Sequence, residues 1–236
     1  MLGLGNNSTK HKKTFTDLNS VSRLQMWLQN GIGVAVGQWD DSSRQGRNIT
    51  QATSGNQAAV SDGGLDFEEG ESDHYDFTPE IAISKNQGFC IAYVVKTESA
   101  SNNTLVSDTS NEVIQIQNSS KLRINCNDDS NISTQLHVGS AFGNAKMQIL
   151  INRTGAGVWT VYKNASELTI EPDSGSSSNS DDGENVNGFT IDTVGSKGGT
   201  THFMDGIIYE LAFWDRDLTA REMVDVSTYL KNKHGL

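Results

Sequence analysis

Residues Phe89–Lys96 read FCIAYVVK, a short and almost unbroken apolar run. A run of this length between turn-forming residues is typical of a strand that is buried on both faces. Comparable short strand patterns recur along the chain, with turn residues between them, at 23–29, 64–67, 74–77, 105–106, 113–117, 122–125, 135–138, 146–152, 159–163, 189–194 and 206–214. Many short strands with regular turns favour a β-sandwich or a β-barrel.

Length and composition agree with this fold class. The chain has 236 residues, of which 35% are hydrophobic, and it contains 23 glycines but only two prolines. All-β sandwiches reach this size as one domain, and a chain of this length can bury a core without disulfide staples. We therefore expect Cys90 to be a buried free thiol rather than half of a disulfide framework involving Cys126.

One amphipathic helix is predicted over 219–234, at the end of the chain. Thr219 and Glu222 have the spacing of a capping box, and Gly235 stands where a glycine C-cap belongs. Apolar residues recur between them at helical spacing: Met223, Val226, Tyr229 and Leu230. We expect this helix to pack on the sandwich or on a neighbouring subunit.

The net charge of −11 makes nucleic acid and anionic membranes unfavourable partners. The N-terminus is positively charged instead, with a basic cluster of Lys10, Lys12 and Lys13. These lysines belong either to a solvated terminus or to an arm that docks on an acidic neighbour in an assembly. The predicted organisation is an extended arm over 1–20 followed by the sandwich over 21–236, which includes the helix.

No apolar stretch approaches the length of a membrane span, and the Met1–Gly5 start lacks the apolar core of a signal peptide. We therefore expect the chain to be made in a cytoplasm and not exported by the general route.

Two segments resemble a known family. One reads QWDDSS over 38–43 and continues through QAT at 51–53 to GLDF at 64–67. The other reads DGIIYEL over 205–211 and continues through DRDLT at 215–219 to the terminal KHGL. Together they resemble concanavalin A-like, laminin-G-like jelly-roll domains, and most closely the structural proteins of marine tailed bacteriophages, especially those of cyanobacteria.

This resemblance implies an all-β fold, a two-sheet antiparallel jelly-roll sandwich with the terminal helix alongside. It also implies a non-enzymatic virion protein, made in the host cytoplasm. Such a protein would decorate or cement the capsid in many copies, contact other capsid or tail subunits, and adhere weakly to host surface glycans. The alternatives are a tail or fibre adhesion protein, or a free-standing calcium-dependent lectin. Because fold does not select function, the residues must discriminate among these roles.

An acidic segment is the candidate metal site. Residues 61–80 hold eight acids and no lysine or arginine, a density that suits a hard cation such as Ca²⁺. The candidate ligands are Asp66, Glu68, Glu71 and Asp73. The alternative is a solvated acidic loop, since no calcium-loop motif with set spacing is present. Glycoside hydrolysis needs two carboxylates in fixed geometry, and the Gly70-containing turn between Glu68 and Glu71 argues against it, so we predict no catalytic residues.

Glycan-binding residues stay open at this point. The four tryptophans, Trp27, Trp39, Trp159 and Trp214, lie in strand-like segments, which favours core packing over sugar stacking. Polar residues near Trp39 and Arg216 are predicted to hold the fold. The carboxylates of Asp40 and Asp41 would satisfy turn amides, and Arg216 would pair with Asp215 or Asp217 to fix the last strand to the helix.

Overall fold

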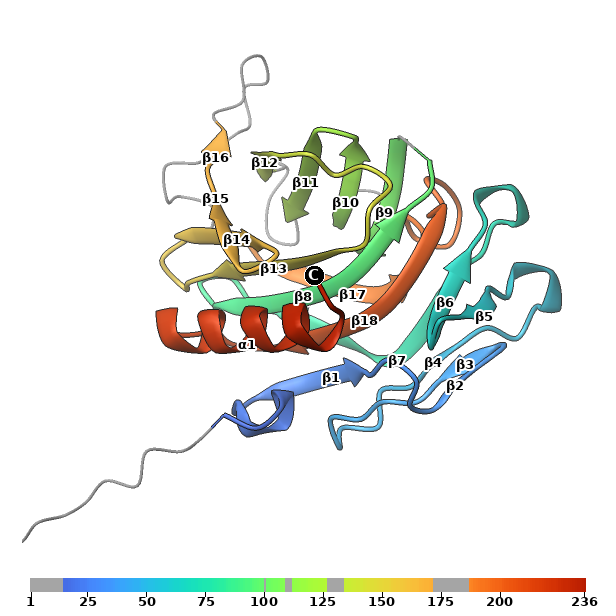
Figure 1. Ribbon diagram of the computed structural model, residues 1–236, viewed down its shortest axis with the longest axis horizontal. Helices are drawn as coiled ribbons and strands as arrows, with labels where there is room; N and C mark the ends of the chain where they lie inside the picture. The colour runs from blue at the N-terminus through green and yellow to red at the C-terminus, as the bar shows by residue number, and fades with distance from the viewer. Residues whose placement is uncertain (1–14, 100, 109–111, 127–133, 172–186) are drawn as a thin grey trace, which may run out of the picture.

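The computed structural model describes residues 15–99, 101–108, 112–126, 134–171 and 187–236. It consists of two antiparallel sheets packed face to face, with one α-helix after the last strand (Figure 1). This confirms the predicted two-sheet sandwich and its C-terminal helix. The described residues contain no helix that is long and apolar enough to cross a membrane.

An eight-stranded sheet forms one layer, in the order β15-β14-β13-β8-β18-β6-β5, with β1 also paired to β18. Its central strand β8 is the apolar run quoted above, extended by one residue to Thr97. The strands are β1 (Leu24–Leu28), β5 (Ala59–Ser61), β6 (Gly64–Phe67), β8 (Phe89–Thr97), β13 (Met147–Arg153), β14 (Trp159–Lys163), β15 (Ser166–Leu168) and β18 (Gly206–Trp214).

A ten-stranded sheet forms the other layer, in the order β16-β12-β11-β10-β9-β17-β7-β4-β3-β2. The strands are β2 (Val34–Ala35), β3 (Gln38–Trp39), β4 (Ile49–Thr50), β7 (Tyr75–Ile83), β9 (Ser101–Ser107), β10 (Val113–Asn118), β11 (Lys121–Cys126), β12 (Thr134–Gly139), β16 (Ile170–Glu171) and β17 (Phe189–Val194). Three short 3-10 helices, η1 (Leu18–Ser20), η2 (Ser54–Asn56) and η3 (Glu69–Glu71), lie in the connections.

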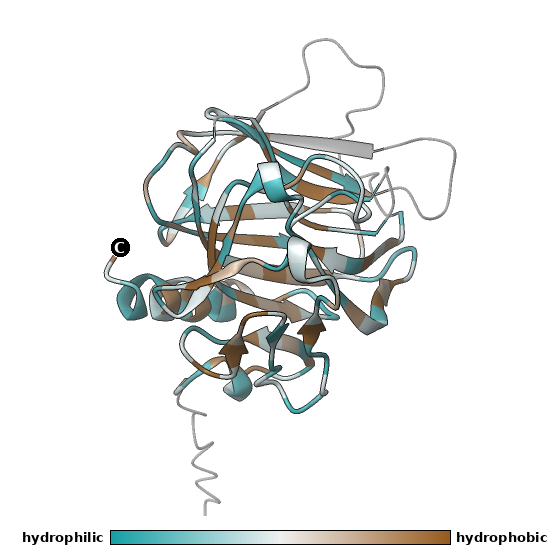
Figure 2. Ribbon diagram, turned by 90° about the vertical axis from the view of Figure 1, so that its right-hand side faces the viewer, coloured by the Kyte–Doolittle hydropathy of each residue, from teal (hydrophilic) through white to brown (hydrophobic). Residues whose placement is uncertain are grey.

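The main core fills the space between the sheets. In a strand, successive side chains point to opposite faces, so alternate residues enter this core. Figure 2 shows the resulting change between hydrophobic and hydrophilic residues along the strands. Aromatic rings fill the middle, where Phe89 stacks on Phe213 at 5.9 Å and on Phe189 at 5.4 Å between ring centroids. Trp39 and Trp159 also belong to this core.

A second apolar cluster covers the outer face of the eight-stranded sheet. There α1 (Ala220–Lys233) and the N-terminal segment bury residues of β8 and β18 (Figure 1). Trp27 and Trp214 lie in this cluster, so all four tryptophans are buried, as predicted. β8 therefore packs against apolar residues on both faces, which explains its unbroken run in the sequence, and β18 is buried on both faces with Glu210 as its one charged residue.

The N-terminal segment from Phe15 onward belongs to this second cluster. Leu18 is fully buried, and the Phe15 ring meets the Tyr229 ring edge-on at 5.7 Å. Residues 18–20 form the η1 turn, so the predicted arm, which was expected to be extended through residue 20, ends inside a packed segment. Residues 1–14, including Lys10, Lys12 and Lys13, lie outside the described residues, so the arm stays a prediction.

The helix begins as predicted, with a capping box in which Thr219 accepts from the Glu222 amide and Glu222 accepts from the Thr219 amide. The predicted partner of Arg216 was wrong, because the carboxylates of Asp215 and Asp217 are not its ion-pair partners in the described residues. Arg216 instead forms two hydrogen bonds with Glu222, of 2.9 and 2.7 Å, while Asp215 pairs with Arg23. Side chains of adjacent residues point in different directions, so Glu222 on the helix is better placed to pair with Arg216 than Asp215 or Asp217.

This contact gives a prediction for acid stability. The Arg216 guanidinium lowers the pKa of Glu222 to about 2 from an ordinary 4.5. A carboxyl group whose folded pKa is depressed contributes stability that is present above its unfolded pKa and is lost as the pH falls toward its folded pKa. Because the Glu222 side chain is 29% exposed, solvent screening reduces the expected contribution to about 1.5 kcal/mol.

Glu222→Gln should therefore lower the free energy of unfolding at neutral pH by about that amount, and the difference from wild type should shrink between pH 4.5 and pH 2. Urea denaturation across this pH range measures both effects. Asp225→Asn is the control, since the Arg221–Asp225 pair joins a largely exposed arginine to the same helix. If the stability difference between Glu222→Gln and wild type stays constant with pH, the ion pair does not change the pKa of Glu222 on folding.

Within the described residues Cys90 and Cys126 are buried and form no disulfide, as predicted for Cys90. Burial raises the pKa of the Cys90 thiol well above its ordinary value, which makes it an unreactive core residue.

Candidate functional site

The outer face of the ten-stranded sheet is polar, in contrast to the helix-covered outer face of the other sheet. One row of residues in register crosses this face from β11 to β3: Asn125, Val113, Ser107, Thr193, Asp76, Thr50 and Gln38. Their immediate neighbours along the strands, such as Ile114, Val106 and Tyr75, belong to the core. The alternation of core and polar residues defines this surface, which we call the outer face.

A second row lies beside the first, where Thr104 of β9, Gln115 of β10 and Arg123 of β11 stand in register. Thr104 and Gln115 are almost completely buried, at 0% and 1% exposure, whereas Arg123 is partly exposed. Arg123 lies between Leu122 and Ile124, both core residues, so alternation directs its guanidinium to the outer face.

The connection from β17 to β18, residues 195–205, is fixed to this face by Ser107. The Ser107 hydroxyl donates to the Ser196 carbonyl at 2.7 Å and accepts from the Gly198 amide at 2.9 Å. Gly195 has φ +86°, and a Cβ there would lie 2.3 Å from the Phe67 ring, so no other residue fits. These contacts fix the residues on either side of Lys197, and Lys197 and His202 both lie near enough to Arg123 for its charge to lower their pKa values.

Arg123, Lys197 and His202 form a basic group that we call the cation patch, in which Arg123 and Lys197 carry the charge and the lowered pKa leaves His202 uncharged at neutral pH. Burial and the charge of Arg123 both lower the pKa of Lys197. Burial, Lys197 and Arg123 lower the pKa of His202, against which only the Glu69 charge acts. Burial also lowers the pKa of Arg123. The three groups are therefore close enough to repel one another, and their charges are only partly hydrated.

Four polar atoms in these rows and the adjoining connection are buried without a hydrogen-bond partner in the described part of the chain: Thr104 Oγ1, Gln115 Oε1, Arg123 Nε and His202 Nδ1. Buried polar groups are normally paired, because each unpaired one costs about 1–3 kcal/mol. Similar atoms lie elsewhere in the described chain, but Thr104, Gln115 and Arg123 stand in register on adjacent strands, so three of the four lie together just beneath the outer face with hydrogen-bonding capacity that the described residues do not use. His202 also has φ +49°, an uncommon conformation for a residue other than glycine.

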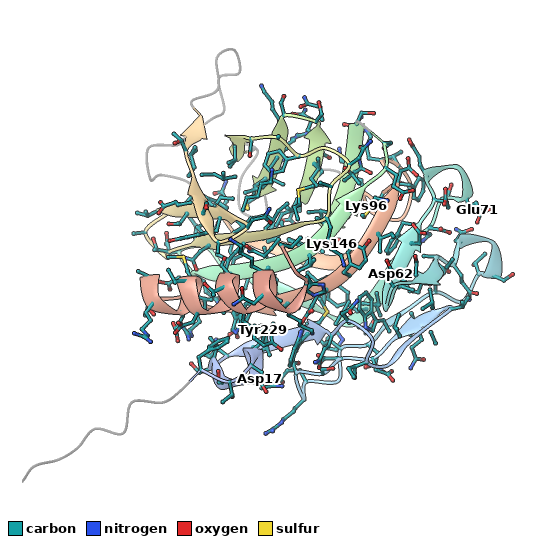
Figure 3. The ribbon with its side chains drawn as sticks, viewed as in Figure 1. Asp17, Asp62, Glu71, Lys96, Lys146 and Tyr229 are labelled. Atoms are coloured by element: carbon teal, nitrogen blue, oxygen red, sulfur yellow. The ribbon has the colours of Figure 1, made fainter. Side chains whose placement is uncertain are left out.

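The predicted metal ligands are only partly brought together. Asp73 is buried, and one of its oxygens is used within the loop, because Oδ2 accepts a hydrogen bond from the Glu68 amide at 2.9 Å. Glu68 and Glu71 are exposed, and Glu71 lies at the periphery of the molecule (Figure 3). Asp66 lies on β6, opposite Ile207 of β18.

Other acids lie nearer to Asp66 than the sequence suggested. Burial first, and then the charges of Glu98 and Asp205, raise the pKa of Asp66, and burial followed by the charge of Asp205 raises that of Glu68. Across the described residues, no group of three or more His, Cys, Asp or Glu side chains is disposed to hold a metal ion. A calcium site at Asp66, Glu68, Glu71 and Asp73 stays a prediction.

A separate cavity of about 360 Å³ lies between residues 141–147 and Lys163. Its lysines are already engaged. Lys146, labelled in Figure 3, has its Nζ atom 3.6 Å from the centroid of the Tyr209 ring, and Lys163 donates to the Ala141 carbonyl. Both cavity lysines therefore already have partners within the chain.

Comparisons with known proteins identify the fold and not a family. No family model matches the chain, and no curated protein matches it. Solved structures do match. The binding domain of Paraclostridial Mosquitocidal Protein 1 has a TM-score of 0.65 at 14% identity, and the binding domain of botulinum neurotoxin serotype G has 0.58 at 16%. A Trypanosoma rangeli sialidase has a TM-score of 0.58 at 14% identity.

The matches cover 88–90% of this chain, but the chain spans only about half of the two toxin binding domains (52% and 51%) and a third (33%) of the sialidase chain. Identities this low show a shared sandwich fold and nothing finer. The predicted virion role, with its capsid or tail partners, receives no support from these likenesses and stays a prediction.

The cation patch was not predicted from the sequence. Arg123 is recognisable only as the polar residue between Leu122 and Ile124, and Lys197 and His202 lie in the glycine-rich stretch GSKGGTTH over 195–202. The three residues are brought together by strand pairings between distant segments.

Proposed function

We propose that this chain is a non-catalytic glycan-binding module whose ligand lies on the outer face of the ten-stranded sheet. The observation that carries the proposal is the set of unpaired buried polar atoms around Gln115 and Arg123. A site built to hydrogen-bond sugar hydroxyls keeps donors and acceptors that only the ligand, or a water it holds, completes. The sandwich supports these groups on rigid strands.

The side chains on the outer face support binding rather than catalysis. Hydrolysis of a glycosidic bond needs two carboxyl groups facing each other across the ligand. Two carboxylates on this face, Asp76 and Asp192, both lie within hydrogen-bond distance of Thr193 Oγ1, at 3.3 and 2.8 Å. That arrangement is a structural hydrogen bond between neighbouring strands. The patch beside Gln115 is cationic.

The first test is a glycan screen followed by titration of the best ligand against Gln115→Leu. Leucine has a similar volume but no amide, so affinity should fall about tenfold. Stability should be unchanged or higher, because a buried unpaired carbonyl is removed. Calorimetric titration and thermal unfolding measure the two effects.

Gln148→Leu is the matched control. Gln148 is equally buried but lies on β13 of the other sheet, where its Oε1 accepts from the Ala165 amide at 3.0 Å. This variant should lose stability and keep its affinity. If the screen finds no glycan, or if Gln115→Leu binds as tightly as wild type, the outer face is not the binding site.

A further inference from the structure

We infer that the cation patch recognises an anionic substituent of the glycan, a carboxylate or a sulfate ester, with Arg123 as the principal contact and Lys197 and His202 beside it. This inference rests on the proposed function and makes it more specific. It assigns the ligand class to acidic sugars and leaves the neutral part of the ligand to Gln115 and the surrounding polar face.

The first support is that Arg123 and Lys197 have no acidic ion-pair partner among the described residues. In the described part of the chain, neither Arg123 nor Lys197 forms an ion pair. The ion pairs among the described residues involve other cations: Arg23, Lys96, Arg216, Arg221, Lys233 and His234. Acids outnumber Lys and Arg by 29 to 18 in this chain. Arg123 and Lys197 lie close enough for their charges to interact, and neither has an acid as an ion-pair partner, so an anionic ligand would neutralise both.

The second support is the free-energy cost of the arrangement. A partly buried guanidinium without a partner loses hydration and gains nothing in return. Mutual repulsion adds to this cost, as the lowered pKa values of Lys197 and His202 indicate. Binding sites typically contain neighbouring groups that destabilise the free protein and have unused hydrogen-bonding capacity. A bound ligand offsets this unfavourable free energy by pairing with them.

The third support is the chemistry of the side chains. The Arg123 guanidinium can hold two oxygens of a carboxylate or sulfate at once, whereas Lys197 supplies a point charge. The Arg123 Nε atom, one of the donors of a bidentate contact, is among the unpaired buried atoms. Gln115 stands in register with Arg123 on the neighbouring strand, so one ligand can contact both.

The overall charge restricts the ligand to a small anionic group. The −11 charge repels long polyanions, including nucleic acid and highly sulfated polymers. At physiological ionic strength, charges beyond about 8 Å are largely screened, so a single carboxylate or sulfate experiences mainly the local cation patch. An acidic sugar residue within an otherwise neutral glycan fits both conditions.

The test compares three ligands of matched size: a neutral oligosaccharide, the same unit carrying a carboxylate, and the same unit carrying a sulfate ester. Wild type should bind at least one acidic form about tenfold more tightly than the neutral form. The carboxylate and sulfate arms identify the anion, and added salt should weaken only the acidic arm that binds.

Arg123→Gln should remove this preference while neutral binding persists, and its stability should not fall, since an unpaired cation is lost. Arg44→Gln is the control, because Arg44 is exposed and forms no ion pair with the described residues, and the variant carries the same net charge. Equal binding of neutral and acidic ligands by wild type, or an unchanged preference in Arg123→Gln, would overturn the inference and leave the proposed function intact. Failure of all three ligands would overturn both.

Discussion

Glu210→Ala is expected to lower the free energy of unfolding by about 3–5 kcal/mol, because it leaves buried partners of a charge network unpaired. Glu210 on β18 is 1% exposed. Its Oε1 accepts from Trp27 Nε1 at 2.7 Å and from Lys233 Nζ at 3.0 Å, and its Oε2 lies 2.7 Å from His234 Nε2.

This carboxylate joins three parts of the chain that are far apart in sequence: β1, β18 and the end of α1. Without it, the Trp27 indole loses its acceptor inside the second apolar cluster, and the Lys233 ammonium, 23% exposed, loses its counter-charge. The terminal helix and the N-terminal strand should then loosen together.

Chemical denaturation of Glu210→Ala and Glu210→Gln measures this effect. Glutamine keeps the size and one acceptor, so its loss should be smaller than that of alanine. Asp225→Ala, which breaks an exposed ion pair on the same helix, should change stability far less. A loss below about 1 kcal/mol for Glu210→Ala would mean that the network is not formed in solution.

Asp41→Ala should cost about 3 kcal/mol, since this carboxylate satisfies four donors, three in the loop after β3 and one on β1. Asp41 Oδ1 accepts from the amides of Trp27 and Ser43, both at 2.8 Å. Its Oδ2 accepts from Ser43 Oγ at 2.7 Å and from the Arg47 amide at 3.0 Å. The carboxylate thereby links the loop over 41–47 to strand β1.

Two variants separate this role from a simple loss of charge. Asp41→Asn keeps the Oδ1 acceptor and should lose about half as much stability. Asp40→Ala removes the adjacent, exposed carboxylate, whose contacts are with the side chains of Gln38 and Asn48. In thermal unfolding, the loss of stability should be largest for Asp41→Ala, smaller for Asp41→Asn and smallest for Asp40→Ala. Equal effects of Asp40→Ala and Asp41→Ala would contradict the assignment.

Much of the fold could be predicted where local pattern and burial agree. The runs at 159–163, 189–194 and 206–214 match β14, β17 and β18 residue for residue. The capping box of α1 was also predictable, because its contacts are local. Turn residues and short apolar runs specify strand positions well in a chain with this many tight connections.

Long-range pairing was not predictable in the same way. Sheet order depends on contacts between distant segments, so the pairing of β1 and β6 along one edge of β18 had no sequence signal. The true partner of Arg216 depends on where the helix begins relative to the strand. The site was missed for the same reason, since Arg123 and His202 are separated by 78 residues and meet only through the sheet.

A crystal structure of the chain with the best acidic ligand from the screen would test whether the outer face of the ten-stranded sheet binds a glycan beside Gln115 and Arg123. We expect an anionic group of the ligand against the Arg123 guanidinium and a hydroxyl or bridging water at Gln115 Oε1. A ligand seated instead on the acidic loop near Asp66 and Asp73, or in the cavity beside Lys163, would contradict this expectation.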